Sequence, residues 1–127
     1  MPKLFLLLAS ANGFLAVALG AFAAHGLKSR LDANMLQTFQ TGVQYHMSHA
    51  LALFAVALLS LYFPAEKLPR IAAYSFLLGI LLFSGSLYVL SLSGTRWLGA
   101  ITPFGGVAFL VGWGCLFWFA LTRNLIQ

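Results

Sequence analysis

The stretch QTFQTGVQYHMSH, from Gln37 to His49, runs without interruption into ALALFAVALLSLYF, from Ala50 to Phe63. The first part is rich in Gln, Thr, Tyr, Ser and His, whereas the second is almost wholly apolar and carries no charge. An uncharged apolar run of this kind is typical of a helix that enters a lipid bilayer. Polar side chains are costly inside a bilayer, so those of the first part are the first candidates for function.

The composition of the whole chain supports a membrane location. Of its 127 residues, 61% are hydrophobic and only 7% are charged, against roughly 25% charged in ordinary soluble domains. The seven Lys and Arg residues outnumber two acids but form no run, which argues against nucleic acid as a partner. Cys115 is the single cysteine, so no intrachain disulfide can form, and it is expected to pack as a small core or lipid-facing residue.

Four apolar runs predict an all-α integral membrane protein with four transmembrane helices. Short connections make successive helices antiparallel, which gives an up-down-up-down bundle. The first run ends in AFA, which fits a signal-peptide cleavage site, but about 21 uncharged residues favour a membrane span. The predicted helices cover about residues 4–25, 35–63, 70–92 and 103–122 of a single domain, 1–127.

Helix ends and contacts can be predicted from individual residues. Gly26 is expected to end the first helix in a left-handed conformation. Asn34 with Gln37 three residues later resembles a capping box, which places the start of the second helix there. In the first span, Asn12 shares a face with small residues and is expected to form a hydrogen bond inside the bundle.

The start of the fourth span carries Thr102-Pro103, and Pro is well suited to a first helical turn. Gly105-Gly106 follows directly. A glycine pair at a helix start can hold an anion, but no phosphate-loop Lys follows. We therefore expect a point of close helix packing.

Polar side chains are concentrated toward one end of the predicted bundle. The end of the first helix, the start of the second, the end of the third and the start of the fourth all meet at the same membrane face. This arrangement predicts one polar cluster or pocket near that face. Its candidate binding residues are His25, Gln37, Gln40, Gln44, Tyr45, His46, His49, Ser84, Tyr88 and Thr102.

The second helix carries polar groups on two faces. At 100° per residue, one stripe runs through Gln37, Gln40, Gln44 and neighbouring hydroxyls, and Tyr45 with the two histidines lies on another. Neither stripe can face lipid cheaply. We therefore expect either that the other helices surround this part, or that one stripe faces the partner in a homo-oligomer.

The three histidines allow several interpretations. His25, His46 and His49 could form a metal, haem or quinone site, but no carboxylate within a span could orient a ligand histidine. Hydrogen-bonded neutral histidines are the simpler interpretation, and we assign no cofactor.

A serine of the third span with one of these histidines is a conceivable nucleophile and base, although membrane serines usually bond to backbone or neighbouring helices. Enzymatic activity therefore remains uncertain and is not favoured.

Four ordered motifs carry a family resemblance. They are GAFAAHGLK (20–28), FQTGVQYHMSHALAL (39–53), FSGSLYVLSLSG (83–94) and GAITPFGGVAFLVGW (99–113). The chain resembles the YgdD/YwdK family of small, uncharacterised bacterial inner-membrane proteins, which has eukaryotic TMEM-type relatives. The resemblance implies a multi-pass inner-membrane protein and no established activity, so it implies no catalytic residues.

Our functional hypothesis is a non-enzymatic membrane protein that binds a lipid, a small molecule or a partner through the polar end of the bundle. The first alternative is a small transporter or proton-coupled channel, which would need a continuous polar path to the other face.

The distribution of Lys and Arg weakly favours cytoplasmic termini, because four of these residues lie on the face that holds the termini and three on the other face. One predicted face holds Lys3, Lys67, Arg70 and Arg123, and the other holds Lys28, Arg30 and Arg96.

Overall fold

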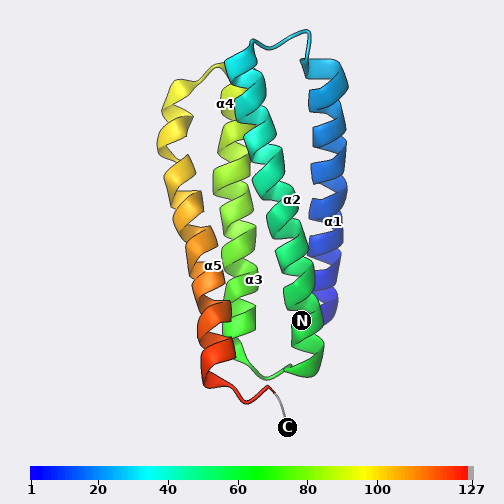
Figure 1. Cartoon of the computed structure of the whole chain (residues 1–127), viewed down its shortest axis with the longest axis vertical. Helices are drawn as coiled ribbons and strands as arrows, with labels where there is room; N and C mark the ends of the chain where they lie inside the picture. The colour runs from blue at the N-terminus through cyan, green and yellow to red at the C-terminus, as the bar shows by residue number, and fades with distance from the viewer. Residues whose placement is uncertain (126–127) are drawn as a thin grey trace.

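A computed structural model describes residues 1–125, and these form helices joined by short turns (Figure 1). Two π-helical turns, η1 and η2, and one 3₁₀ turn, η3, extend or interrupt the α-helices. The elements are α1 (Pro2–Phe22), η1 (Ala23–Leu27), α2 (Ala33–Tyr62), α3 (Lys67–Gly79), η2 (Ile80–Ser84), α4 (Gly85–Ser93), η3 (Arg96–Ala100) and α5 (Thr102–Thr122).

Within the described residues these elements make four spans, which run as Pro2–Leu27, Ala33–Tyr62, Lys67–Ser93 and Arg96–Thr122. Each is long and apolar enough to cross a bilayer. Successive spans alternate in direction, and the beginning of α1 and the end of α5 lie toward the same end of the bundle (Figure 1). The predicted all-α, four-span membrane fold is confirmed, and each helix begins up to three residues earlier than predicted.

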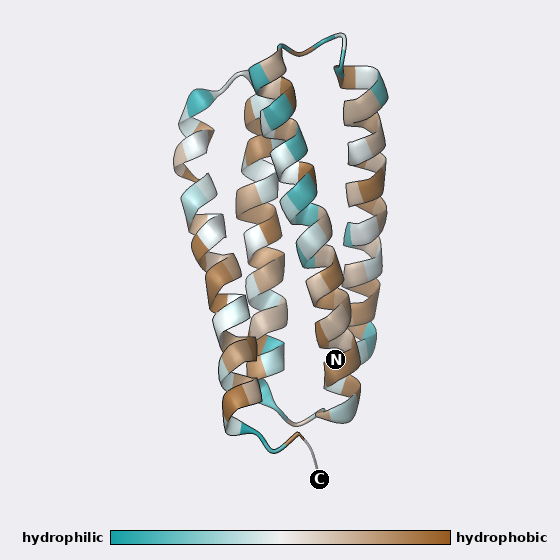
Figure 2. Ribbon diagram, viewed as in Figure 1, coloured by the Kyte–Doolittle hydropathy of each residue, from teal (hydrophilic) through white to brown (hydrophobic). Residues whose placement is uncertain are grey.

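The helix α2 is the centre of the packing. It contacts α1 on one side and the span made of α3, η2 and α4 on another, whereas α5 packs mainly on α3 and η2. We call residues 12–49 and 83–113 the polar half, and residues 1–11, 50–82 and 114–125 the terminal half. Figure 2 shows the contrast along α2, which is hydrophilic in the polar half and hydrophobic in the terminal half.

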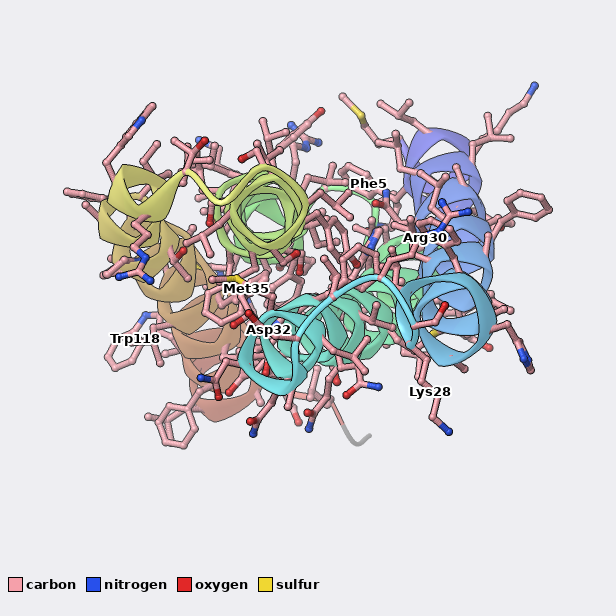
Figure 3. The ribbon with its side chains drawn as sticks, turned by 90° about the horizontal axis from the view of Figure 1, so that it is seen from above. Phe5, Lys28, Arg30, Asp32, Met35 and Trp118 are labelled. Atoms are coloured by element: carbon pink, nitrogen blue, oxygen red, sulfur yellow. The ribbon has the colours of Figure 1, made fainter. Side chains whose placement is uncertain are left out.

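The terminal half is held by apolar packing. Its core contains fully buried Phe5, Leu53, Val56 and Phe76, with alanines of α2 and α3 between them. The alanines bring the helix backbones close together, which is how apolar helices associate in lipid. The outer face carries large exposed side chains, such as Trp118, which projects outward from α5 (Figure 3).

Two predicted helix ends are wrong. The N-cap of α2 is Asp32, whose carboxylate accepts a hydrogen bond from the Met35 backbone N–H at 2.8 Å, and Asn34 is already helical. A negatively charged side chain is also favourable near the positive end of the helix dipole, which suits Asp32 to this position.

Gly26 does not end the first span in a left-handed conformation. It lies inside the π-turn η1, which continues the helix to Leu27, and a Cβ at this position would lie 2.7 Å from the ring of Phe22. Glycine is therefore needed at position 26 because a larger residue would collide with the Phe22 ring, not because the backbone is left-handed. Within residues 1–125 the left-handed position is Gly94, with φ 73°, which caps α4 through an N–H bond to Leu90 O.

The prediction of close packing at Gly105 is confirmed. A Cβ there would lie 2.3 Å from the backbone nitrogen of Phe83, so α5 and η2 touch backbone to backbone at this point. Pro103 stands in the first turn of α5, as predicted.

Candidate functional site

The centre of the polar half is a hydrogen-bonded chain that joins three helices. His46 of α2 is 4% exposed. Its Nδ1 lies 2.9 Å from the hydroxyl of Tyr88 in α4, and its Nε2 lies 2.9 Å from Oδ1 of Asn12 in α1. The Asn12 amide nitrogen in turn donates to the Leu8 carbonyl at 2.8 Å. The predicted hydrogen bond of Asn12 inside the bundle is therefore present.

These partners determine the proton positions of a neutral His46. The Asn12 nitrogen donates to a carbonyl, so Asn12 Oδ1 faces the imidazole and can only accept. Nε2 must then carry the hydrogen, which leaves Nδ1 to accept from the Tyr88 O–H. The chain runs in one direction, from Tyr88 through His46 and Asn12 to Leu8, and it uses both imidazole nitrogens.

His49, one turn further along α2, forms a second connection with the opposite tautomer. Its Nδ1 donates to the Tyr45 carbonyl at 2.8 Å, and its Nε2 accepts from the Trp113 indole N–H at 3.0 Å. A carbonyl can only accept and an indole N–H can only donate, so the hydrogen sits on Nδ1. The ring stacks on Phe109 with centroids 3.5 Å apart. This contact joins α2 to α5.

Serine and threonine hydroxyls form further connections in the same half. Ser84, at the end of η2, is fully buried and donates to the Gly42 carbonyl of α2 at 2.8 Å. Ser86 and Thr102 lie 2.6 Å apart and link α4 to α5. Ser91 bonds back to the Tyr88 carbonyl. These serines bond away from the histidines, so the arrangement gives no support to serine–histidine chemistry.

A cleft of about 420 Å³ lies between α2 and α5 in the polar half. Tyr45 and His49 form one wall, the η2 residue Phe83 contributes its floor, and α5 forms the other wall. Val107, Leu110 and Trp113 on that wall are each about half exposed or more, so the cleft opens sideways toward the lipid. The α5 residues that line it are Pro103, Gly106, Val107, Phe109, Leu110 and Trp113.

The predicted residues do not gather into a single pocket. Tyr45 and His49 line the cleft, while His46, Tyr88, Ser84 and Thr102 form connections between helices. The other helices do not surround the whole first half of α2, because three glutamines and one serine there are exposed on the outer face of the helix. They are Gln37, Gln40, Gln44 and Ser48. Contact of this stripe with an oligomer partner stays a prediction.

His25 is exposed at the end of the bundle and does not join the other two histidines. The structure therefore does not bring together the three histidines of the metal, haem or quinone alternative. No group of three His, Cys, Asp or Glu side chains within residues 1–125 is placed to hold a metal ion. The physical reason is that His46 bonds to residues of α1 and α4 whereas His49 bonds to α5, and each already uses both ring nitrogens.

Sequence reasoning missed the α5 side of the cleft. A signal was present in Trp113, which stands in the middle of an apolar run, whereas membrane tryptophans favour the interfaces. A tryptophan within a span is expected to find an acceptor for its N–H, as Trp113 does with His49. Asn12 was expected to be paired, but its partner could not be identified without the tertiary structure.

Comparison with known proteins places this architecture in a family. The family model described as "Protein of unknown function (DUF423)" matches residues 19–106. The UPF0382 membrane protein YwdK of Bacillus subtilis (strain 168) is 52% identical over 116 residues, which cover 87% of this chain and 90% of the relative. No solved structure matches significantly.

Two further relatives are similar over comparable lengths. A UPF0382 membrane protein of Haemophilus influenzae is 48% identical over 113 residues, 89% of this chain and 90% of the relative. The UPF0382 inner membrane protein YgdD of Escherichia coli (strain K12) is 40% identical over 120 residues, 90% of this chain and 86% of the relative. These matches confirm the resemblance drawn from the four motifs, and the chain belongs to the DUF423 (UPF0382) family of multi-pass membrane proteins.

Proposed function

We propose that this protein binds the acyl chain of a membrane lipid in the cleft between α2 and α5, with a carbonyl oxygen of the bound lipid held by Tyr45. The observation that carries the proposal is the lateral opening of this cleft beside a polar group that has no partner. Its volume of about 420 Å³ falls in the range of small-molecule sites, roughly 300–1,000 Å³.

The lining of the cleft favours a hydrocarbon chain. Both nitrogens of His49 are already bonded, and most of the remaining wall is apolar or aromatic. A water-soluble solute would find few partners there. A lipid chain can enter from the side without leaving the bilayer, and the aromatic rings of Phe83 and Phe109 offer flat contact surfaces.

Tyr45 supplies the polar contact. Its ring packs on Phe83 with centroids 4.5 Å apart, which fixes its direction. The side chain is 41% exposed, and within the described chain its hydroxyl has no hydrogen-bond partner among the protein groups. A phenol hydroxyl donates well to a carbonyl oxygen, so Tyr45 is suited to hold a lipid that carries a carbonyl group at this depth.

The terminal half disfavours the transport alternative. A polar path to the other face would have to pass between buried Leu53, Val56 and Phe76. Among residues 1–125, Ser60 is the single buried polar side chain in that half. The proposal is therefore binding at one side of the bundle rather than passage through it.

The test is photo-crosslinking with a phospholipid that carries a diazirine in its acyl chain, followed by mass spectrometry of the labelled peptides. We expect the label on the α5 segment that holds Val107, Leu110 and Trp113. Gly106→Leu should remove most of it, because the added side chain extends into the cleft. Tyr45→Phe should weaken labelling about fivefold, the effect of losing one hydrogen bond of about 1 kcal/mol.

The matched control is Gly114→Leu, which adds the same atoms two turns away in α5, where a Cβ meets nothing within 4 Å. This variant should keep the labelling of the unmodified protein. Equal labelling of the Gly106→Leu and Gly114→Leu proteins would show that lipid contacts α5 without using the cleft, and the proposal would be abandoned.

We infer in addition that both termini lie on the cytoplasmic side. The end that holds the termini carries Lys3, Lys67, Arg70 and Arg123, and the other end carries three basic residues. Membrane proteins place more Lys and Arg residues on the cytoplasmic side, so the end with four is assigned to the cytoplasm. A C-terminal green fluorescent protein fusion should be fluorescent and an alkaline phosphatase fusion inactive. The reverse pattern would overturn this orientation.

A further inference from the structure

The outer face of α2, opposite its contacts with the other helices, carries a seven-residue repeat along its whole length. Side chains at alternating spacings of four and three form one continuous seam. One position of the repeat is occupied by Gln37, Gln44, Leu51 and Leu58. The other is occupied by Thr41, Ser48, Ala55 and Tyr62. All are exposed except Thr41, which is half-buried, so the other described helices leave most of the seam uncovered. The start of α1 borders the seam at Leu58.

The period of this seam is characteristic of helix pairing. A strict spacing of 3.5 residues keeps one face turned toward a partner helix in a left-handed crossing. Thr41, Ser48 and Ala55 place a small side chain at every seventh residue, which lets two backbones approach closely. The seam therefore alternates small residues with larger ones that can interlock.

The glutamine at the middle of the polar half lies at the level of the hydrocarbon. His46 is bonded to Asn12 of α1 and Tyr88 of α4, so Gln44, two residues away, is level with these parts of the neighbouring spans. At that level, Phe14 is 75% exposed and Val107 is 57% exposed. Large apolar side chains turned outward mark the lipid-facing band, and an amide in that band without a partner is unfavourable.

The polar side chains of the seam differ in how they are satisfied. The hydroxyls of Thr41 and Ser48 bond to carbonyls of their own helix, those of Gln37 and Gln44, so they present only small surfaces outward. The amides of Gln37 and Gln44 form no hydrogen bond with any group in residues 1–125. Both side chains are exposed, so their donors and acceptors are available to a partner outside this chain.

A second copy of this chain fits these requirements better than another partner. All copies insert with the same orientation, so two α2 helices that pack together are parallel, and a twofold axis along the membrane normal sets each residue opposite its equivalent. An amide both donates and accepts, so each glutamine can pair with the same glutamine of the second copy. The seam carries no charge that would require a complementary partner.

We propose that the protein forms a parallel homodimer through this seam of α2, with Gln44 hydrogen-bonded to its equivalent inside the bilayer. The seam is separate from the lipid cleft, since Tyr45 and His49 lie about 80–120° around α2 from it. Dimerisation and lipid binding can therefore be tested independently.

The test is disulfide crosslinking in native membranes with copper phenanthroline, using single-cysteine proteins in a Cys115→Ser background. Gln44→Cys and Ala55→Cys should each give a covalent dimer. Phe54→Cys and Leu61→Cys provide the control, because these positions are exposed on the same helix but off the seam, and they should stay monomeric. Crosslinking at all four positions to a similar extent, or at none, would overturn the proposal.

A second measurement uses substitutions that leave the bundle intact. Ala55→Ile adds bulk to the seam, and Ala18→Ile adds the same bulk to an exposed position of α1. The dimer association constant in detergent should fall about tenfold or more for Ala55→Ile and about threefold for Gln44→Leu. Ala18→Ile should leave it unchanged, and an equal effect of the two isoleucines would contradict the seam.

Discussion

The two halves of the bundle hold their helices together by different means. In the terminal half, Phe5, Leu53 and Phe76 pack against alanines and no buried hydrogen bond between side chains joins the described helices. In the polar half, His46, His49 and Ser84 each bond across to another helix. Helices in lipid gain nothing from excluding water, so they associate by close packing or by hydrogen bonds. The terminal half relies on packing, and the polar half adds these hydrogen bonds to close contacts such as that at Gly105.

The difference has a consequence for function. Close packing leaves no space, whereas a few hydrogen bonds can hold helices at a separation set by the side chains that form them. The α2–α5 contact in the polar half is made by His49, Trp113 and the ring of Phe109, and the cleft lies beside these residues. The polar half is therefore able to combine a stable fold with a site open to lipid.

The largest effect is expected from removing a packed ring in the terminal half. Phe5→Ala should lower the free energy of unfolding by about 3 kcal/mol, since the ring is fully buried. It also packs edge-on against Tyr74, with the two ring centroids 5.5 Å apart. Unfolding by SDS in mixed micelles measures the change. Phe14→Ala in the same helix removes a ring that is 75% exposed and should have little effect. Similar losses for both would mean that packing of the terminal half is not decisive.

The next effect is expected from the central chain of the polar half. His46→Leu should cost about 2 kcal/mol, because it leaves both Asn12 and Tyr88 without their partner. The triple variant Asn12→Leu, His46→Leu, Tyr88→Phe removes all three polar groups together and should be more stable than His46→Leu alone. If the triple variant instead loses the sum of the free energies lost in the three single variants, the three residues contribute independently and not as one hydrogen-bonded series.

A smaller effect should follow from Ser84→Ala. The Gly42 carbonyl would lose a buried hydrogen bond from another helix, which corresponds to about 1 kcal/mol. Ser10→Ala is the matched control, since Ser10 is exposed and bonds only to the Leu6 carbonyl of its own helix. The difference between the two serines in the same unfolding assay measures the contribution of the connection between helices.

The smallest effect is expected at the membrane surface of the terminal half. Glu66→Gln breaks the ion pair with Arg123, whose Nε lies 2.9 Å from Glu66 Oε2. Both side chains are partly exposed, so the loss should be about 0.5 kcal/mol or less and should shrink further at high salt. A loss comparable to that of His46→Leu would indicate that the polar half is not where the important hydrogen bonds lie.

The extent of prediction from sequence follows the same division. The four spans could be predicted because length and hydropathy alone define a membrane helix. Close packing at Gly105 could be predicted because the glycine pair lacks the Lys of a phosphate-binding loop. The polar half could be located, since topology brings four polar segments to one face. The partners of His46 and His49 could not be assigned, because rotation of each helix decides which side chains meet. Gln37, Gln40 and Gln44 were predicted to be covered by the other helices or by an oligomer partner. The other helices leave them exposed, and the partner stays a prediction.

The account rests on two neutral histidines that hold opposite tautomers as closed connections between helices. Solid-state ¹⁵N NMR of histidine-labelled protein in bilayers, with His25→Gln to remove the third signal, tests this most directly. We predict one imidazole protonated only on Nε2, for His46, and one protonated only on Nδ1, for His49. An imidazolium signal, or two histidines with the same tautomer, would contradict the hydrogen-bond arrangement on which the polar half depends.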